Sequence, residues 1–184
     1  MAKNSEIYAA QLFIDAASAD QVEVIRTEMK KVLMALLDQP QFLDILKSPV
    51  IDVGKKKEWV KGVYLGQVST ILIDFFMTLI ESDVFDRLKE IEGFYDHYVC
   101  QYLEEYFNIV EGVVYSAFPL ADFELKKLEN IFTEKIGKQV RLVEVVDATL
   151  LGGYKVEVKS YVYDGTIRLQ LQQLKQSLRN VDLV

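Results

Sequence analysis

Apolar side chains recur at helical spacing through residues 1–107. In each of six successive segments they stand three or four positions apart, as one buried face of a helix requires. The segments begin near Ser5, Asp20, Pro40, Asp52, Val68 and Ser82. Short connections between helices favour antiparallel packing, so the pattern predicts a six-helix bundle.

The fifth segment, residues 68–80, is apolar on more than one side, because Ile73 and Met77 fall outside its main stripe. Such a helix either lies at the centre of a bundle or has a second partner. For any single residue, the bundle core explains the apolar character equally well. Taken together, the first and fifth segments are able to form a groove for another amphipathic helix. The candidate groove residues are Tyr8, Leu12, Ile71, Leu72, Phe75 and Phe76.

The pattern changes at residue 108. Segments rich in β-branched residues or alternating in polarity predict strands at 109–115, 140–146 and 154–159. A helix is predicted from Pro119 to Gly137. A last helix carries an apolar stripe of Ile167, Leu171, Leu174 and Leu178. The expected fold class is therefore α+β, with a helical bundle over 1–107 and a small α+β domain over 108–184.

The net charge of the chain is −7, and all of it falls in the first part. Residues 1–107 carry eleven Lys and Arg against eighteen Asp and Glu, whereas residues 108–184 are balanced. This division supports two units with different surfaces. An acidic chain is a poor match for nucleic acid, which binds basic surfaces. The acidic part is suited to a basic partner segment, although a solvated face explains it too.

Few residues offer catalytic or metal-binding chemistry. His97 and Cys100 are the chain's one histidine and one cysteine, and two ligands do not make a zinc site. Gly152-Gly153 lacks the spacing of a phosphate-binding loop and leads into a strand instead of a helix. The sequence therefore predicts no catalytic residues, no metal and no cofactor.

Nothing in the sequence reads as a membrane span or an export signal. The longest apolar stretch, 68–80, is too short to cross a bilayer and contains Asp74. The first residues do not have the pattern of a signal peptide. We expect a protein of a cytoplasm-like compartment that reaches a membrane only through a partner.

The carboxy-terminal part carries the most specific motif. Residues 145–156 read Val-Val-Asp-Ala-Thr-Leu-Leu-Gly-Gly-Tyr-Lys-Val, and residues 162–168 read Val-Tyr-Asp-Gly-Thr-Ile-Arg. With Tyr8-Ala-Ala-Gln-Leu-Phe13, Gln39-Pro-Gln-Phe42 and Ser116-Ala-Phe-Pro-Leu120 in the same order, the chain resembles the delta subunits of F-type ATP synthases, the oligomycin-sensitivity-conferring protein family. It departs from the family's usual Gly-Asp at Lys159-Ser160, and from a small residue at Leu169.

The resemblance implies a mechanical role without catalysis. In this family the helical domain receives the N-terminal helix of an alpha subunit at the top of the catalytic head. The carboxy-terminal domain holds the C-terminal ends of the b-type stalk subunits. The implied location is peripheral, within the complex, on the cytoplasmic face of the bacterial inner membrane.

Two other classes of function are weaker matches. A small-molecule-binding or enzymatic α+β domain fused to a helical bundle would need polar groups converging in an apolar pocket. A membrane-surface protein acting through Lys55–Lys57 would need a basic amphipathic helix, whereas the first part is net acidic.

Overall fold

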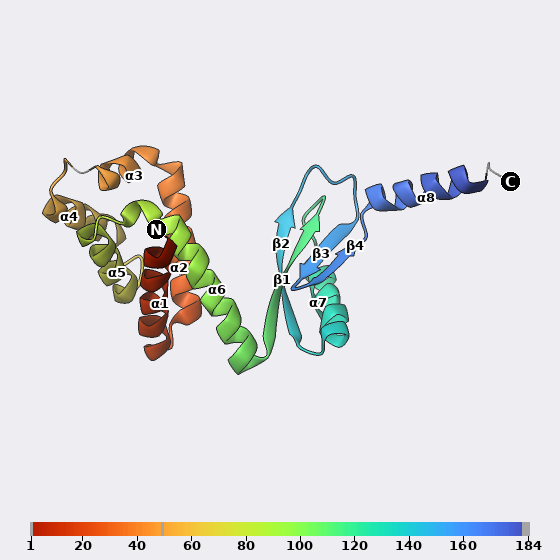
Figure 1. Cartoon of the computed structure of the whole chain (residues 1–184), viewed down its shortest axis with the longest axis horizontal. Coiled ribbons are helices and arrows are strands. Elements are labelled where there is room, and N and C mark those ends of the chain that lie inside the picture. The colour runs from red at the N-terminus through yellow and green to blue at the C-terminus, as the bar shows by residue number, and fades with distance from the viewer. Residues whose placement is uncertain (1, 49, 182–184) are drawn as a thin grey trace. The chain divides into compact units, whose positions relative to one another are not determined.

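The computed structural model describes the backbone of residues 2–48 and 50–181, and the side chains of residues 5–48 and 50–176. Within these residues it contains eight α-helices and one four-stranded sheet, which confirms the α+β class (Figure 1). The contacts divide the chain into two compact units, Met1–Gln101 and Tyr102–Val184. This division falls inside a helix, slightly before the change of pattern at residue 108.

The first unit is helical. Its elements are α1 (Ala2–Ser18), α2 (Val22–Asp38), α3 (Pro40–Lys47), α4 (Val53–Tyr64), α5 (Thr70–Glu81), a 3-10 turn (Phe85–Arg87) and most of α6 (Leu88–Phe107). The Asp52 carboxylate accepts hydrogen bonds from the N–H groups of Gly54 and Lys55, and so caps α4. The Ser69 hydroxyl caps α5 in the same way, by accepting from Leu72 N–H.

Buried stripes of several helices form the core of this unit. On α2 the stripe is Ile25, Met29, Val32 and Leu36, as the spacing predicts. On α5 the aromatic ring of Phe76 lies 6.1 Å from that of Tyr64 and 5.8 Å from that of Phe85. These rings join α4, α5 and the 3-10 turn into one packed cluster.

Polar contacts tie α6 to α2. The Asp96 carboxylate is 2.7 Å from both the Arg26 guanidinium and the Lys30 ammonium. The Tyr95 hydroxyl donates to the Val22 carbonyl at 3.0 Å. Burial alone would raise the pKa of Asp96, but the hydrogen bonds from Arg26 and Lys30 hold it below its usual value. Asp96 therefore stays charged and paired at neutral pH.

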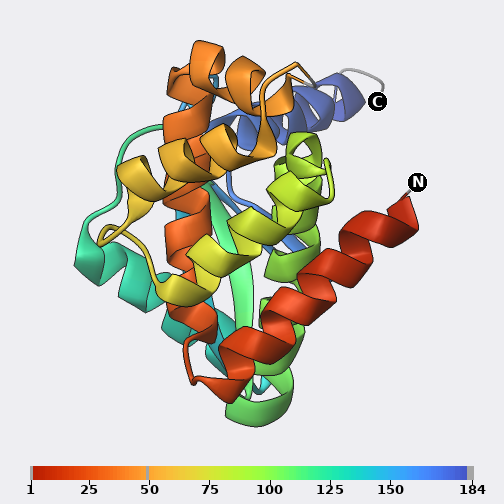
Figure 2. The same ribbon diagram turned by 90° about the vertical axis from the view of Figure 1, so that its left-hand side faces the viewer.

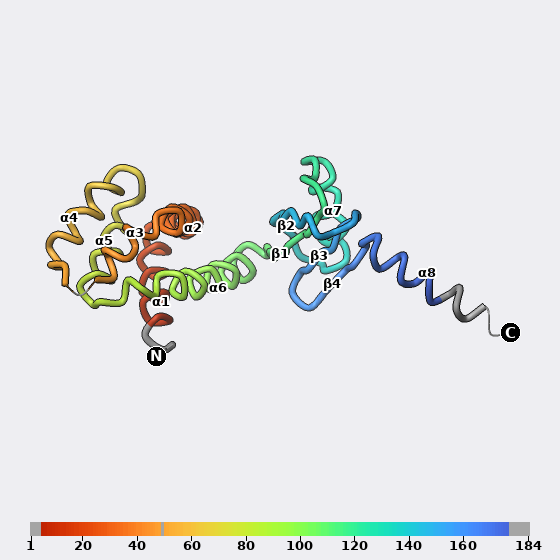
Figure 3. Tube along the Cα trace, turned by 90° about the horizontal axis from the view of Figure 1, so that it is seen from above, coloured from red at the N-terminus to blue at the C-terminus, as the bar shows by residue number. Residues whose placement is uncertain are grey.

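The second unit begins with the last turns of α6. It continues through β1 (Ile109–Ser116), α7 (Asp122–Ile136), β2 (Gln139–Val146), β3 (Tyr154–Val158), β4 (Tyr161–Asp164) and α8 (Ile167–Val181). The strand order is β2-β1-β3-β4, with β1 and β2 parallel and the other pairs antiparallel. Its core lies between α7 and the sheet, where Leu128 and Phe132 pack with Val114 and Val156. In Figure 3, α8 leads away from this sheet.

Several predicted boundaries are wrong. The helix α2 begins at Val22 instead of near Asp20, because Asp20 takes a left-handed conformation with φ 56° and Gln21 occupies the cap position. The long helix α6 starts at Leu88 instead of near Ser82, since a 3-10 turn comes first. The strand β4 is absent from the sequence prediction. All four of its side chains are exposed, so it lacks the buried alternation that marks a strand.

Candidate partner-binding surfaces

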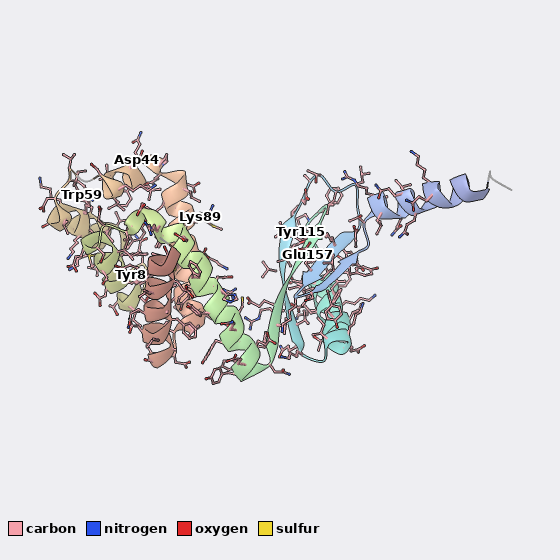
Figure 4. The ribbon with its side chains drawn as sticks, in the orientation of Figure 1. Tyr8, Asp44, Trp59, Lys89, Tyr115 and Glu157 are labelled. Carbon is pink, nitrogen blue, oxygen red and sulfur yellow. The ribbon has the colours of Figure 1, made fainter. Side chains whose placement is uncertain are left out.

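A groove runs between α1 and α5, which lie side by side (Figure 2). It encloses about 250 Å³. Its lining residues are Tyr8, Gln11 and Asp15 of α1, and Ile71, Asp74, Phe75 and Thr78 of α5. Tyr8, Ile71 and Phe75 give it an apolar floor, and Tyr8 is marked on α1 in Figure 4. The structure thus brings together three of the six candidate groove residues.

The other three candidates lie in the core of the helical unit. Leu12, Leu72 and Phe76 are each 0% exposed. On α1 the fully buried stripe runs through Ala9, Leu12 and Ala16, one step around the helix from Tyr8. These positions support the walls of the groove without lining it.

The rim of the groove is acidic. Asp15 and Asp74 stand on opposite helices, and Gln11 donates a hydrogen bond of 3.1 Å to Asp15. An apolar floor between acidic edges suits an amphipathic helix whose polar side carries Lys or Arg. Gln11, Asp15, Asp74 and Thr78 were not among the residues chosen from sequence. These four polar residues flank the candidate apolar positions on α1 and α5. Their position beside those candidates is the sequence signal that identifies them.

The second candidate surface is the apolar stripe of α8. Ile167, Leu171 and Leu174 are 42%, 55% and 59% exposed. The fourth predicted residue, Leu178, lies outside the residues whose side chains are described. A stripe of large apolar side chains open to solvent on one helix indicates a missing partner.

The double glycine of residues 152–153 packs against the start of α8. The Gly152 carbonyl accepts from Ile167 N–H at 3.0 Å. Gly153 has φ 77°, and a Cβ added there would lie 2.4 Å from the Gly165 carbonyl oxygen. Only glycine fits so close to this backbone. The loop that contains this glycine pair is therefore also the segment against which the start of α8 packs.

Two aspartates hold the loop segments on either side of this contact between the glycine pair and α8. The Asp147 carboxylate accepts from both the N–H and the hydroxyl of Thr149, and these bonds hold its pKa below the usual value. Asp164 accepts from Thr166 N–H, and the pKa of its carboxyl is lowered by its hydrogen bonds with Thr166. Each carboxylate is thus occupied by a neighbouring threonine, which explains the Asp residues without catalysis.

The side chains considered for metal chemistry have ordinary contacts. The Arg26 guanidinium donates to the Cys100 sulfur at 3.6 Å, and the His97 ring lies 6.4 Å from that of Tyr98. Among the described residues, no three His, Cys, Asp or Glu side chains are grouped to hold a metal ion. Within the same residues, no helix is both long and apolar enough to cross a membrane.

Comparisons with known proteins agree with this arrangement. The family model for the ATP synthase delta (OSCP) subunit matches residues 5–178. The ATP synthase subunit delta of Clostridioides difficile is 31% identical over 175 residues, covering 95% of this chain and 94% of the relative. That of an Exiguobacterium strain is 30% identical over 173 residues, covering 94% and 95%.

A chain in the Toxoplasma gondii mitochondrial ATP synthase hexamer has a similar fold. It superposes with a TM-score of 0.63 at 18% identity, covering 95% of this chain and 96% of that one. The likeness in sequence extends over both units and both candidate surfaces. The chain therefore belongs to the family of ATP synthase delta (OSCP) subunits, which are structural components of the peripheral stalk and not catalytic enzymes.

Proposed function

We propose that this chain fastens the peripheral stalk to the top of the catalytic alpha/beta head of an F-type ATP synthase. The α1–α5 groove receives the N-terminal helix of an alpha subunit. The second unit holds the C-terminal ends of b-type stalk subunits. This static link lets the head resist the torque of the rotor.

The lining of the α1–α5 groove supports the proposed binding of the catalytic head. Its apolar floor of Tyr8, Ile71 and Phe75 offers anchoring contacts, and Asp15 and Asp74 favour a basic polar side on the incoming helix. Because Leu12 and Phe76 fill the core directly behind the floor, the groove is already shaped before a partner arrives. A preformed site avoids the entropic cost of ordering loops on binding.

The exposed apolar stripe of α8 supports the proposed binding of the stalk subunits. Ile167, Leu171 and Leu174 present three apolar side chains at helical spacing, and Leu178 continues the spacing. Such a stripe matches the seam of a helix–helix interface. The start of α8 is anchored by Ile167 N–H, which donates to the Gly152 carbonyl, and by Leu169 N–H, which donates to the Thr166 hydroxyl, so the direction in which the stripe faces is fixed.

The two tasks are divided between two folding units. Residues 1–107 act as a six-helix bundle that holds the head, and residues 108–184 act as the α+β stalk-binding domain. The complex carries the chain at the cytoplasmic face of a bacterial inner membrane, where it is bound peripherally through its partners.

The test is a pair of titrations on the full chain. One uses a synthetic alpha-subunit N-terminal peptide, and the other uses a C-terminal fragment of the b-type subunits. Ile71→Asp should weaken peptide binding by more than about tenfold and leave the stalk fragment unaffected. Leu171→Asp should do the reverse.

The link also requires that both partners bind at once. Sedimentation of the three components together should give one ternary complex. Competition between peptide and stalk fragment, or a variant that weakens both partners equally, would contradict separate surfaces.

A further inference from the structure

The last helix, α8, has the charge and the apolar stripe that the α1–α5 groove is suited to bind. Over Ile167–Val181 it contains three basic residues and no acidic one, so its net charge is +3. The two helices that form the groove, Ala2–Ser18 and Thr70–Glu81, together have a net charge of −3. The chain therefore contains both a basic amphipathic helix and an acidic-rimmed groove for such a helix.

The basic residues of α8 lie beside its apolar stripe. Arg168 and Lys175 are exposed and stand seven positions apart, so they occupy nearly the same side of the helix. At 3.6 residues per turn, that side is about 80° around the helix from the centre of the stripe. Arg168 also interacts electrostatically with Asp147 of its own chain, which leaves Lys175 as the more accessible charge.

The groove and the stripe match in length. The lining residues of the groove span 8–15 on α1 and 71–78 on α5. The exposed stripe spans 167–174 on α8. Each stretch covers about 10 Å at a rise of 1.5 Å per residue. The three large apolar side chains of the stripe thus extend along the whole groove.

From these observations we infer that the α1–α5 groove of one copy of this chain binds α8 of a second copy. Ile167, Leu171 and Leu174 pack on the apolar floor of the groove, and Lys175 faces its acidic rim. The bonds that anchor Ile167 and Leu169 at the start of α8 hold the helix with its stripe open to solvent, where another molecule is able to contact it.

The contact is heterologous, because it joins two different surfaces and each copy offers one of each. It covers both apolar surfaces that are open in the free chain. An alpha-subunit helix competes with it for the groove, and a stalk subunit competes for α8. Self-association is therefore a state of the unassembled chain that both proposed partners reverse.

Two other occupants fit these surfaces less well. Pairing of two α8 helices through their stripes would bring two helices of charge +3 together, and like charges across an interface disfavour binding. A membrane-surface helix generally has aromatic anchors and many basic residues on its polar face. The sequence of α8 has no aromatic residue, and glutamine dominates its polar face.

The experiment is sedimentation velocity of the full chain over a range of concentrations. The sedimentation coefficient should rise with concentration, and this rise should weaken when salt is increased from about 0.05 M to about 0.5 M. Leu171→Asp alters the stripe and Ile71→Asp alters the groove, so each should weaken self-association by about tenfold or more. Gln176→Asp is the matched control, because it adds the same charge on the exposed face opposite the stripe and should leave self-association nearly unchanged.

Mixing the two defective variants gives the sharpest test. Ile71→Asp keeps an intact α8, and Leu171→Asp keeps an intact groove. The two variants should form a complex with each other although neither associates with itself. Such complementation requires the two surfaces to bind one another, and it shows that both variants are folded.

Three results would overturn the inference. One is a chain that stays monomeric at every concentration; the peptide and stalk titrations, done on dilute chain, would still decide the proposed function. Another is self-association that is lost in Leu171→Asp but kept in Ile71→Asp, which would mean that α8 pairs with α8. The third is binding to anionic phospholipid vesicles that Leu171→Asp abolishes, without any self-association, which would assign α8 to a membrane surface.

Discussion

Replacing Gly153 with alanine should loosen the attachment of α8 and weaken stalk binding. Gly153 has φ 77°, and an added Cβ would lie 2.4 Å from the Gly165 carbonyl oxygen and 3.0 Å from the Thr166 Cα. Both neighbours are backbone atoms, so no side chain is able to rotate out of the way. The loop has to move.

The expected cost has two parts. A left-handed conformation costs a non-glycine residue about 1–2 kcal/mol. Movement of the loop strains the hydrogen bonds from Ile167 N–H to the Gly152 carbonyl and from Gly165 N–H to the Tyr154 carbonyl. Each of these contributes about 1 kcal/mol. The free energy of unfolding of the second unit should therefore fall by about 2–4 kcal/mol.

Gly137→Ala separates the two parts. Gly137 ends α7 with φ 76°, but a Cβ added there meets no atom within 4 Å. This variant should lose only the conformational part, about 1–2 kcal/mol. Urea unfolding followed by circular dichroism gives the stabilities, and hydrogen exchange at Ile167 reports the local loosening. Equal stability losses in both variants, with normal stalk binding in Gly153→Ala, would refute the role of close packing at the glycine pair.

Three further predictions test the groove, a half-buried acid and a sheet edge. Phe76→Ala should cost about 3–5 kcal/mol of stability in denaturant unfolding, because its ring is fully buried, whereas Ile71→Asp should cost under about 1 kcal/mol. Burial raises the pKa of Glu92, so the fold favours its protonated form, and this contribution is lost as pH rises through the raised pKa. Glu92→Gln should therefore stabilise the chain at pH 7 by under about 1 kcal/mol and have no effect near pH 4, as thermal unfolding at both pH values will measure. The Glu129 carboxylate accepts from Leu142 N–H at 2.8 Å on the outer edge of β2. Glu129→Ala should cost about 1 kcal/mol and promote self-association, seen by sedimentation velocity, because it leaves an open strand edge.

The sequence predicted helices well where one face alone is apolar. The stripe of α2 is buried as its spacing indicates, and α3, which spans Pro40–Lys47, begins at Pro40 as predicted. The proline at the start of α3 defines where that helix begins. The polar residues between apolar stripes leave only one face of each such helix to be buried. Local chemistry decides such elements, so distant contacts change little.

Periodicity does not predict which face of α5 is buried. Its residues are apolar almost all round, and periodicity then gives no preferred face. Phe75 and Phe76 are adjacent, yet Phe75 lines the groove while Phe76 packs on Tyr64 and Phe85. That choice depends on tertiary contacts with α1, α4 and the 3-10 turn, which the periodicity of α5 does not encode.

One departure from the family has a structural consequence. Lys159, which stands where the resemblance leads one to expect glycine, has φ 52° at the turn between β3 and β4. Its ammonium pairs with Glu104 on the last turns of α6. Lys138, which follows α7, reaches the same carboxylate at 2.7 Å. These pairs join the last turn of α6 to the ends of α7 and β3 within the second compact unit.

In the most specific motif of the chain, the polar and glycine residues contact one another. Asp147 is held by Thr149 and Asp164 by Thr166, while Gly153 packs on the backbone of Gly165 and Gly152 on Ile167. A catalytic loop would instead leave a carboxylate or an N–H group directed at open space. Here the polar groups are used up at the base of α8, while the apolar stripe of that helix stays exposed. Since a link under torque needs a stiff base and an open apolar contact, this motif is better explained by mechanical load than by chemistry.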